Sequence, residues 1–138
     1  MGQARLYLLI SAAGLVPIAL SYGLDPAHYL PWLLQIHPRG VNLIHLLRSL
    51  MGLYLGLVCL WLAGAWRGGA LLRTALISEI VFMAGLAAGR LLSLLLDGWP
   101  SPVLILYAFA EILLAVWGVI CLRKLTIMPT SGYTADPG

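Results

Sequence analysis

Residues 71–96 read LLRTALISEIVFMAGLAAGRLLSLLL, an apolar run interrupted by Arg73, Glu79 and Arg90. About 20 predominantly apolar residues are enough for a helix to cross the hydrocarbon core of a bilayer. The run is therefore long enough to predict a transmembrane helix. Since a charge at the centre of a bilayer costs roughly 2.5–3.5 kcal/mol on insertion scales, each internal charge needs a partner, a water-lined cavity or a route to the interface.

Three further apolar runs predict the same kind of helix. We expect spans over about 6–22, 41–65 and 102–122 in addition to 71–96. The chain of 138 residues is 62% hydrophobic and only 9% charged, with a mean hydropathy of +0.97, whereas about a quarter of the residues in a soluble domain are charged. The sequence thus predicts an all-α integral membrane protein, a four-helix bundle that occupies residues 1–125.

Two segments of the chain do not fit a membrane span. Residues 27–39 mix His28, Tyr29 and Trp32 with Leu and Pro, and aromatic residues suit the headgroup level of a bilayer. We therefore expect a short interfacial helix after the first span. Residues 126–138 are polar, contain Pro and Gly and lack apolar periodicity, so we expect a C-terminal tail that is disordered on its own. The first span resembles the apolar core of a signal peptide, but we expect it to be retained.

The basic residues are distributed asymmetrically. In the predicted topology five of them lie on the side of the termini and the middle turn, namely Arg5, Arg67, Arg73, Arg123 and Lys124. Only Arg39 lies in the loops on the other side. Under the positive-inside rule both termini are expected to be cytoplasmic. Because the basic residues do not cluster, the net charge of +3 does not indicate binding to nucleic acid.

Several polar residues are expected at one depth in the membrane. Counted at about 1.5 Å of rise per residue, Arg48, Arg90 and Glu111 all fall about 10 Å below the outer boundary. An Arg–Glu–Arg cluster across three helices is then available, because a carboxylate accepts hydrogen bonds from guanidinium groups. The predicted intramembrane polar cluster comprises His45, Arg48, Arg90, Asp97, Tyr107 and Glu111. Glu79 lies on the same face of its helix as Arg90 but deeper, and forms a second polar position.

Two interpretations of this cluster remain open. The charges can fix the register of the helices, as buried polar residues do in other assemblies. They can also face a cavity that holds a polar headgroup, a small anion or a proton. Docking to another membrane subunit is a further alternative.

No arrangement in the sequence is typical of a catalytic or metal site. Ser49 and Ser93 lie near His45 in the predicted topology, but they form no recognisable nucleophile–base pattern. Cys59 and Cys121 lie in apolar runs without CxxC or Cys/His spacing. We expect no catalytic residue, no metal and no cofactor, so the sequence favours a non-catalytic protein over an enzyme.

Two pairs of glycines have the small-xxx-small spacing that allows helix backbones to approach closely. Gly52 and Gly56 lie in the second span, and Gly85 and Gly89 lie in the third. We expect them to pack helices of this chain against each other. Contact with another copy or another subunit is the alternative.

The motifs RSLMGLYLG at 48–56, GLAAGRLLS at 85–93 and DGWPS at 97–101, together with Glu111, resemble a bacterial family of small four-span membrane proteins, domain of unknown function 4345. The resemblance covers the membrane portion of the chain. It implies a bacterial origin and a four-helix unit, and we therefore expect the protein in the bacterial inner membrane. It also implies that three residues are among the family's characteristic positions, namely Arg48, Arg90 and Glu111. It implies no particular reaction.

We expect a non-catalytic accessory or assembly subunit of a bacterial membrane protein complex, which packs through its Gly-rich helix faces and its C-terminal tail. Its partners would be membrane lipids and a larger complex or a homo-oligomer. The alternative is a small-molecule or lipid-binding membrane protein, a carrier or an enzyme, with a polar Arg/Glu pocket under the outer leaflet. A pocket predicts charges that border a cavity between helices, whereas a subunit predicts dry, paired charges and extensive partner contacts.

Overall fold

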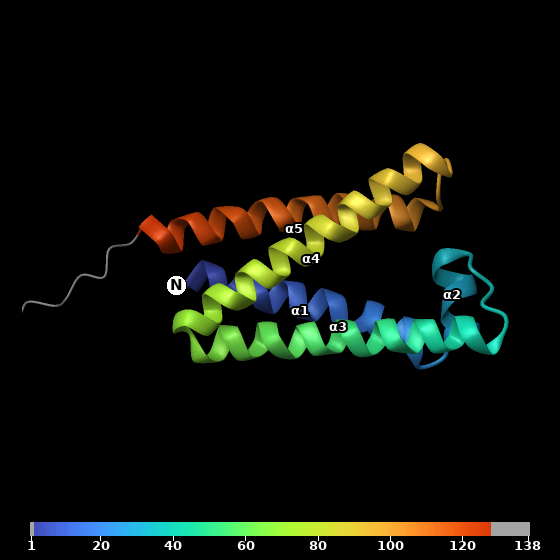
Figure 1. The fold of residues 1–138 in the computed structure, drawn as a ribbon, viewed down its shortest axis with the longest axis horizontal. Coiled ribbons are helices and arrows are strands. Elements are labelled where there is room, and N and C mark those ends of the chain that lie inside the picture. Colours follow the sequence, from blue (N-terminus) through green and yellow to red (C-terminus); the bar gives the residue numbers. More distant parts are fainter. Residues whose placement is uncertain (1, 128–138) are drawn as a thin grey trace, which may run out of the picture.

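The computed structural model describes residues 2–127, and this part of the chain folds into five helices joined by short connections (Figure 1). The helices are α1 (Gly2–Gly23), α2 (Pro26–Leu34), α3 (Val41–Arg67), α4 (Gly69–Leu96) and α5 (Pro102–Ile127). All but α2 are long and apolar enough to cross a membrane. The all-α fold class with four spanning helices and a short helix after the first is thus confirmed, and the protein is a multi-pass membrane protein.

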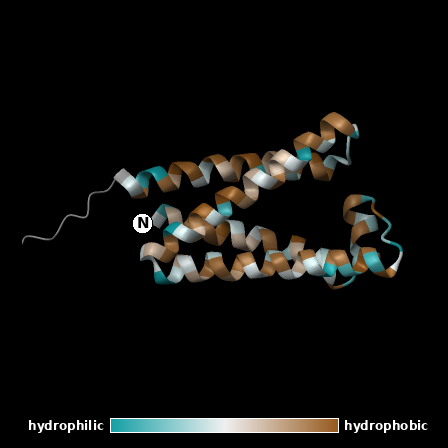
Figure 2. Ribbon diagram, in the orientation of Figure 1, coloured by the Kyte–Doolittle hydropathy of each residue, from teal (hydrophilic) through white to brown (hydrophobic). Residues whose placement is uncertain are grey.

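Each spanning helix extends beyond its predicted span at one or both ends. The hydrocarbon core is about 30 Å thick, but the interfacial layers bring the bilayer to about 40–45 Å, so a helix continues past its most apolar part. The same effect carries α5 through residues 126 and 127, which were expected in the tail. The remainder of that predicted tail, 128–138, lies outside the described residues. Figure 2 shows hydrophobic residues along the spans and hydrophilic residues mainly near their ends.

Helix α1 lies at the centre of the bundle and contacts α3, α4 and α5. Half of its most apolar window is buried, against 11–17% for the other spanning helices. Tyr7, Leu8 and Ala19 are fully buried along it. A helix that is hydrophobic all round is expected in a buried position, although one strip of α1 that includes Leu6 and Ile10 stays exposed. The first span therefore supplies much of the core.

The spanning helices form two antiparallel pairs, α1 with α3 and α4 with α5 (Figure 1). The two pairs are joined by a tight turn at Gly68 and Gly69, whose φ angles of 72° and 56° are easily adopted only by glycine. The pairs lie close together at this turn and diverge toward the other end of the molecule (Figure 1). The chain therefore opens at the end that holds α2 and the α4–α5 connection.

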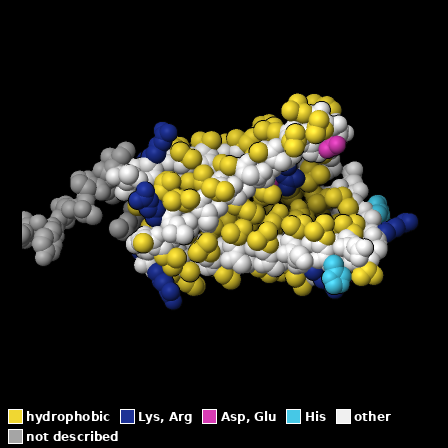
Figure 3. Space-filling model, in the orientation of Figure 1, with side chains coloured by type: hydrophobic (Ala, Val, Ile, Leu, Met, Phe, Trp, Pro, Cys, Tyr) yellow, Lys and Arg dark blue, Asp and Glu magenta, His cyan; other side chains and the backbone are white. Residues whose placement is uncertain are grey.

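The N-terminus and the end of α5 both lie at the closed end, beside the α3–α4 turn (Figure 1). There Lys124 Nζ donates a hydrogen bond to Gln3 Oε1 at 3.0 Å. The Arg5 guanidinium lies next to Gly68. Figure 3 shows several Lys and Arg side chains gathered at this end. The open end instead exposes Trp32 and Trp99, which suits a membrane interface.

Helix α2 is held by its own capping interactions. Asp25 Oδ1 accepts a hydrogen bond from the backbone N–H of His28 at 3.3 Å, and Pro26 occupies the first turn, where its missing N–H costs nothing. Gln35 ends the helix with a φ of 59°. The helix is shorter than the predicted segment 27–39, because this left-handed residue stops it.

The structure corrects the packing role predicted for the four glycines of α3 and α4. Gly52, Gly56, Gly85 and Gly89 are exposed, and a Cβ atom at any of them would meet nothing within 4 Å. The reason is their position around the helix axis. At 3.6 residues per turn, they lie opposite the buried faces of their helices. Those faces carry Tyr54, Val58 and Trp61 on α3, and Leu72, Leu76, Glu79 and Met83 on α4.

Gly64 makes the close contact between α3 and α4 instead. A Cβ atom there would overlap the Cβ of Ala75 and lie 3.0 Å from the carbonyl oxygen of Leu71. The Leu71 oxygen is a backbone atom of α4, and the Ala75 Cβ is bonded directly to that backbone. Neither atom can therefore rotate away from a new side chain. Gly64 is therefore needed because it has no side chain.

Replacing this glycine is expected to destabilise the bundle. Gly64→Ala should lower the free energy of unfolding by about 1–3 kcal/mol, because it overpacks a tight helix contact. Gly52→Ala is the matched control, and it should be neutral or raise stability by up to about 1 kcal/mol through helix propensity alone. Thermal unfolding of the purified variants, followed by circular dichroism in one detergent, compares them. Equal melting temperatures for the two variants would contradict this account of the α3–α4 contact.

Candidate functional site

An ion pair joins α4 to α5 inside the membrane-spanning region. Arg90 Nε donates hydrogen bonds to both carboxylate oxygens of Glu111, at 2.9 and 2.8 Å. The Glu111 side chain is 8% exposed and that of Arg90 is 24% exposed. The two residues meet because α4 and α5 are antiparallel and joined by a short connection, so residues at similar distances from that turn lie at the same level. Burial in apolar surroundings makes such a charge pair dependent on both partners.

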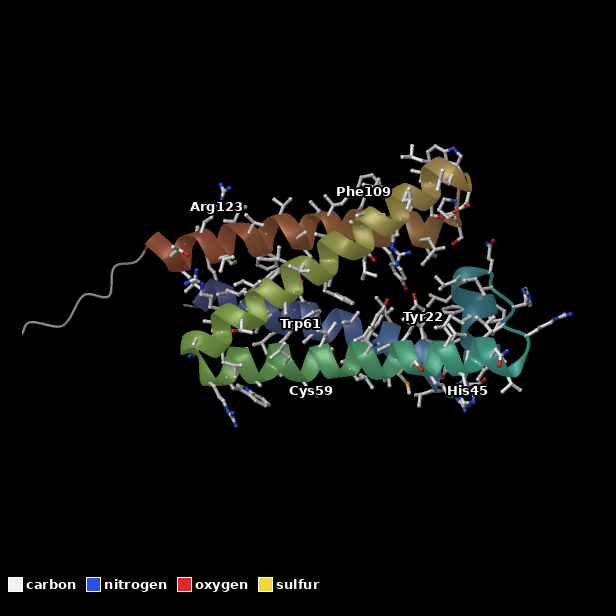
Figure 4. The ribbon with its side chains drawn as sticks, in the orientation of Figure 1. Tyr22, His45, Cys59, Trp61, Phe109 and Arg123 are labelled. Carbon is white, nitrogen blue, oxygen red and sulfur yellow. The ribbon has the colours of Figure 1, made fainter. Side chains whose placement is uncertain are left out.

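Three tyrosines surround this pair. The Arg90 guanidinium carbon lies 5.6 Å from the ring centroid of Tyr107, within the range of a cation–π contact. Tyr22 on α1 approaches the same guanidinium without a well-formed hydrogen bond, and its ring lies 5.8 Å from that of Tyr54 on α3. Figure 4 shows Tyr22 at the end of the bundle where the two helix pairs diverge. All four spanning helices therefore contribute a side chain here.

The ion pair and the tyrosines border a cavity of about 440 Å³. It lies between α1, α4 and α5, and Figure 3 shows the face of the molecule hollowed between the two helix pairs. The polar side chains gather in the half nearer the α4–α5 connection. The rest of the lining is almost entirely apolar and comprises Ile10, Gly14, Leu15, Ile18, Met83, Leu86, Leu106, Ala110 and Leu114, together with Ser11. The cavity thus has one polar half and one apolar half.

Arg90 also borders a second cavity, of about 350 Å³, on the α4–α5 side. Its lining includes Ser93, Trp99 and Phe109. Arg90 therefore lines both cavities.

The structure divides the predicted six-residue polar cluster. Arg90, Tyr107 and Glu111 lie together, but Arg48 is exposed and its Nε donates a long hydrogen bond of 3.4 Å to the Gly23 carbonyl oxygen. Arg48 lies at the right depth but on the outward face of α3, the same face as Gly52. The predicted Arg–Glu–Arg arrangement is therefore wrong in its first member.

His45 and Asp97 also lie apart from the ion pair. His45 is exposed, on the side of α3 that faces away from α4 and α5 (Figure 4). Asp97 is exposed and accepts a hydrogen bond of 2.7 Å from Ser93 Oγ at the end of α4. Neither residue lines either cavity.

Sequence reasoning missed three polar residues that line the cavity, Ser11, Tyr22 and Tyr54. Each is a polar side chain within an apolar run, and Tyr54 shares its helix face with the buried Val58 and Trp61. The helical spacing of Tyr54, Val58 and Trp61 was the sequence signal that could have identified Tyr54 as a buried residue. The Ser11 hydroxyl is buried and has no hydrogen-bond partner in the described part of the chain.

Glu79 lies on the buried face of α4, away from the cavity. It is fully buried, and neither carboxyl oxygen has a hydrogen-bond partner within residues 2–127. Nowhere in this part of the chain do three His, Cys, Asp or Glu residues gather as they would around a metal ion. Glu79 is thus an isolated buried carboxyl group.

The ion pair and the exposed arginine are expected to respond differently to mutation. Arg90→Gln leaves the buried Glu111 carboxylate without its partner, a change that costs about 3–5 kcal/mol when buried pairs are broken. Arg48→Gln, the matched control, should change the free energy of unfolding by less than about 1 kcal/mol, because Arg48 is exposed. Folded yield and thermal unfolding in detergent measure both. Native-like stability of Arg90→Gln would show that the pair does not support the fold.

The unpartnered carboxyl of Glu79 is expected to lower stability. Glu79→Met keeps a similar side-chain volume and removes a buried polar group, so it should raise the free energy of unfolding by about 1–3 kcal/mol. Thermal unfolding of the variant beside the native protein gives the answer. A lower melting temperature for Glu79→Met would mean that the carboxyl has a stabilising partner.

Comparison with known proteins identifies the family of the chain. Neither the curated proteins nor the solved structures give a match. A family model described as Domain of unknown function (DUF4345) matches residues 3–122, which include all four spanning helices up to the last turns of α5. The resemblance found in the sequence motifs is thereby confirmed. The chain therefore belongs to the DUF4345 family, which is defined by a domain of unknown function.

Proposed function

We propose that this protein binds a small amphipathic molecule in the cavity between α1, α4 and α5. The observation that carries the proposal is that the buried Arg90–Glu111 pair borders a cavity instead of being enclosed by dry side chains. Ionisable residues inside a membrane are costly and commonly mark a binding site or pathway. The ion pair would hold the polar head of the ligand, and the apolar lining would hold its chain.

The size and lining of the cavity support a single small ligand. Its volume of about 440 Å³ lies within the range of roughly 300–1,000 Å³ that is usual for small-molecule sites. Such sites combine mostly apolar walls with a few convergent polar groups. A diacyl phospholipid has two long chains, which is more than this volume encloses. A molecule with one chain is therefore the better occupant.

We place the protein in the bacterial inner membrane with both termini in the cytoplasm. The support is the concentration of basic residues at the closed end, which includes Arg5 and Lys124. The open end then faces the outer side of the membrane. In this orientation the polar half of the cavity lies in the outer leaflet.

A second candidate function is that of a non-catalytic accessory subunit in a membrane complex. It is supported by the outward-facing glycines Gly52, Gly56, Gly85 and Gly89, which leave smooth strips on α3 and α4 that another helix can approach. This function predicts a larger assembly in the native mass spectrum after gentle extraction. The binding function predicts a lone chain or a homo-oligomer that carries a small molecule.

Photolabelling with a matched pair of variants tests the binding function. The probe is a single-chain alcohol with a diazirine in its alkyl chain, added to the protein in phosphatidylcholine nanodiscs. Labelled peptides should come from the cavity faces of α1, α4 and α5. Gly14→Leu should reduce this labelling by about tenfold, because the new side chain occupies the cavity and removes at least about 1.4 kcal/mol of binding free energy. Gly14 lines the cavity and has open space around it.

Gly52→Leu is the control. Gly52 is also exposed and a Cβ there would likewise meet nothing within 4 Å, but Gly52 lines neither cavity. Its labelling should equal that of the native protein. Equal labelling of both variants, or labelling spread over all lipid-facing residues, would contradict a specific site.

A further inference from the structure

The charges that line the main cavity cancel each other. Among its lining residues Arg90 and Glu111 carry the only charged side chains, and they are paired at 2.8 Å. The other polar lining residues carry uncharged hydroxyl groups; they are Ser11, Tyr22, Tyr54 and Tyr107. The cavity therefore presents dipoles and hydrogen-bonding groups, but no net charge.

Unused hydrogen-bond donors remain at the ion pair. Arg90 uses only Nε to bind both oxygens of Glu111. A guanidinium has five N–H groups, so the four on the Nη nitrogens are not used by Glu111; the Tyr22 hydroxyl approaches the guanidinium without a well-formed hydrogen bond. The phenol groups of Tyr22, Tyr54 and Tyr107 can also donate. The group that fits these donors is an acceptor oxygen.

A net charge on the ligand would be unfavourable in this cavity. Burial of a charge away from water is costly unless an opposite charge compensates it. Glu111 already compensates Arg90, so an anionic head would leave one negative charge in excess and a cationic head one positive charge. A neutral carbonyl group accepts from the free N–H groups without this cost.

We infer that the ligand is a neutral amphiphile with a carbonyl-bearing head and one apolar chain. This inference rests on the proposed binding function. The head lies at Arg90, where the Nη groups and the phenol groups donate to its oxygen. The chain follows the apolar lining between α1 and α5. On α1 this lining runs from Ile10 to Tyr22, about 18 Å at the helical rise of 1.5 Å per residue, which gives the chain room to extend.

Competition among three probes tests the choice of head. A methyl ketone, an alkyl sulfonate and an alkyl trimethylammonium ion share the same dodecyl chain, and their charges do not depend on pH. Each displaces the photoreactive alcohol from the native protein in phosphatidylcholine nanodiscs, at concentrations expressed per mole of lipid. The ketone should compete at least about tenfold better than either ion. A sulfonate or ammonium that competes as well as the ketone would overturn the inference and leave the binding function standing.

A variant of Glu111 makes the same test from the protein side. Glu111→Gln keeps the shape of the side chain but leaves Arg90 uncompensated, so the preference should shift from the ketone to the sulfonate by about tenfold or more. An unchanged preference in folded Glu111→Gln would also overturn the inference. If this variant does not fold, the order in which the three probes compete on the native protein decides whether the inference holds. If none of the three probes displaces the alcohol, both the inference and the proposed binding function are wrong.

Discussion

The Arg90–Glu111 ion pair is the interaction on which the open half of the bundle depends. Lipid offers the helices no hydrophobic force for association, because a lipid tail is as apolar as a leucine side chain. At the closed end tight contacts such as Gly64 against Ala75 hold α3 to α4. At the open end the pairs diverge, and the guanidinium bonds to Glu111 at 2.8 and 2.9 Å fix α4 to α5. One polar contact thus sets the wall of the cavity.

The central position of α1 explains why a cavity forms at all. Near the closed end its buried Tyr7 donates a hydrogen bond to the Leu114 carbonyl oxygen at 2.9 Å, and its ring packs edge-on against Trp117. Large side chains fill the bundle there. Farther along, α1 offers only the small side chain of Ser11 and no side chain at Gly14 to the space between α1, α4 and α5. Side chains therefore line the space between the helix pairs but do not fill it, and a cavity remains.

Depth in the membrane could be predicted from the sequence, whereas direction around the helix axis could not. Depth follows from residue counts and turns, so Arg90 and Glu111 were expected at one level. The direction of a side chain depends on which neighbours a helix packs against, and no residue count contains this information. Arg48, Gly52 and Gly56 share one stripe of α3, and the whole stripe faces outward. The central place of α1 was likewise not predictable, because all four spans are similarly apolar and only the packing order distinguishes them.

Arg90 borders both cavities, and this sharing has a thermodynamic consequence. A guanidinium held toward one cavity is less available to the other, so two occupants would be linked through one side chain. Linkage of this kind is reciprocal: an occupant of the α4–α5 cavity that weakens binding on the α1 side is weakened by the same factor in return. The ion pair with Glu111 limits how far Arg90 can move between them. If both cavities were occupied, binding in one would therefore be coupled to binding in the other through Arg90.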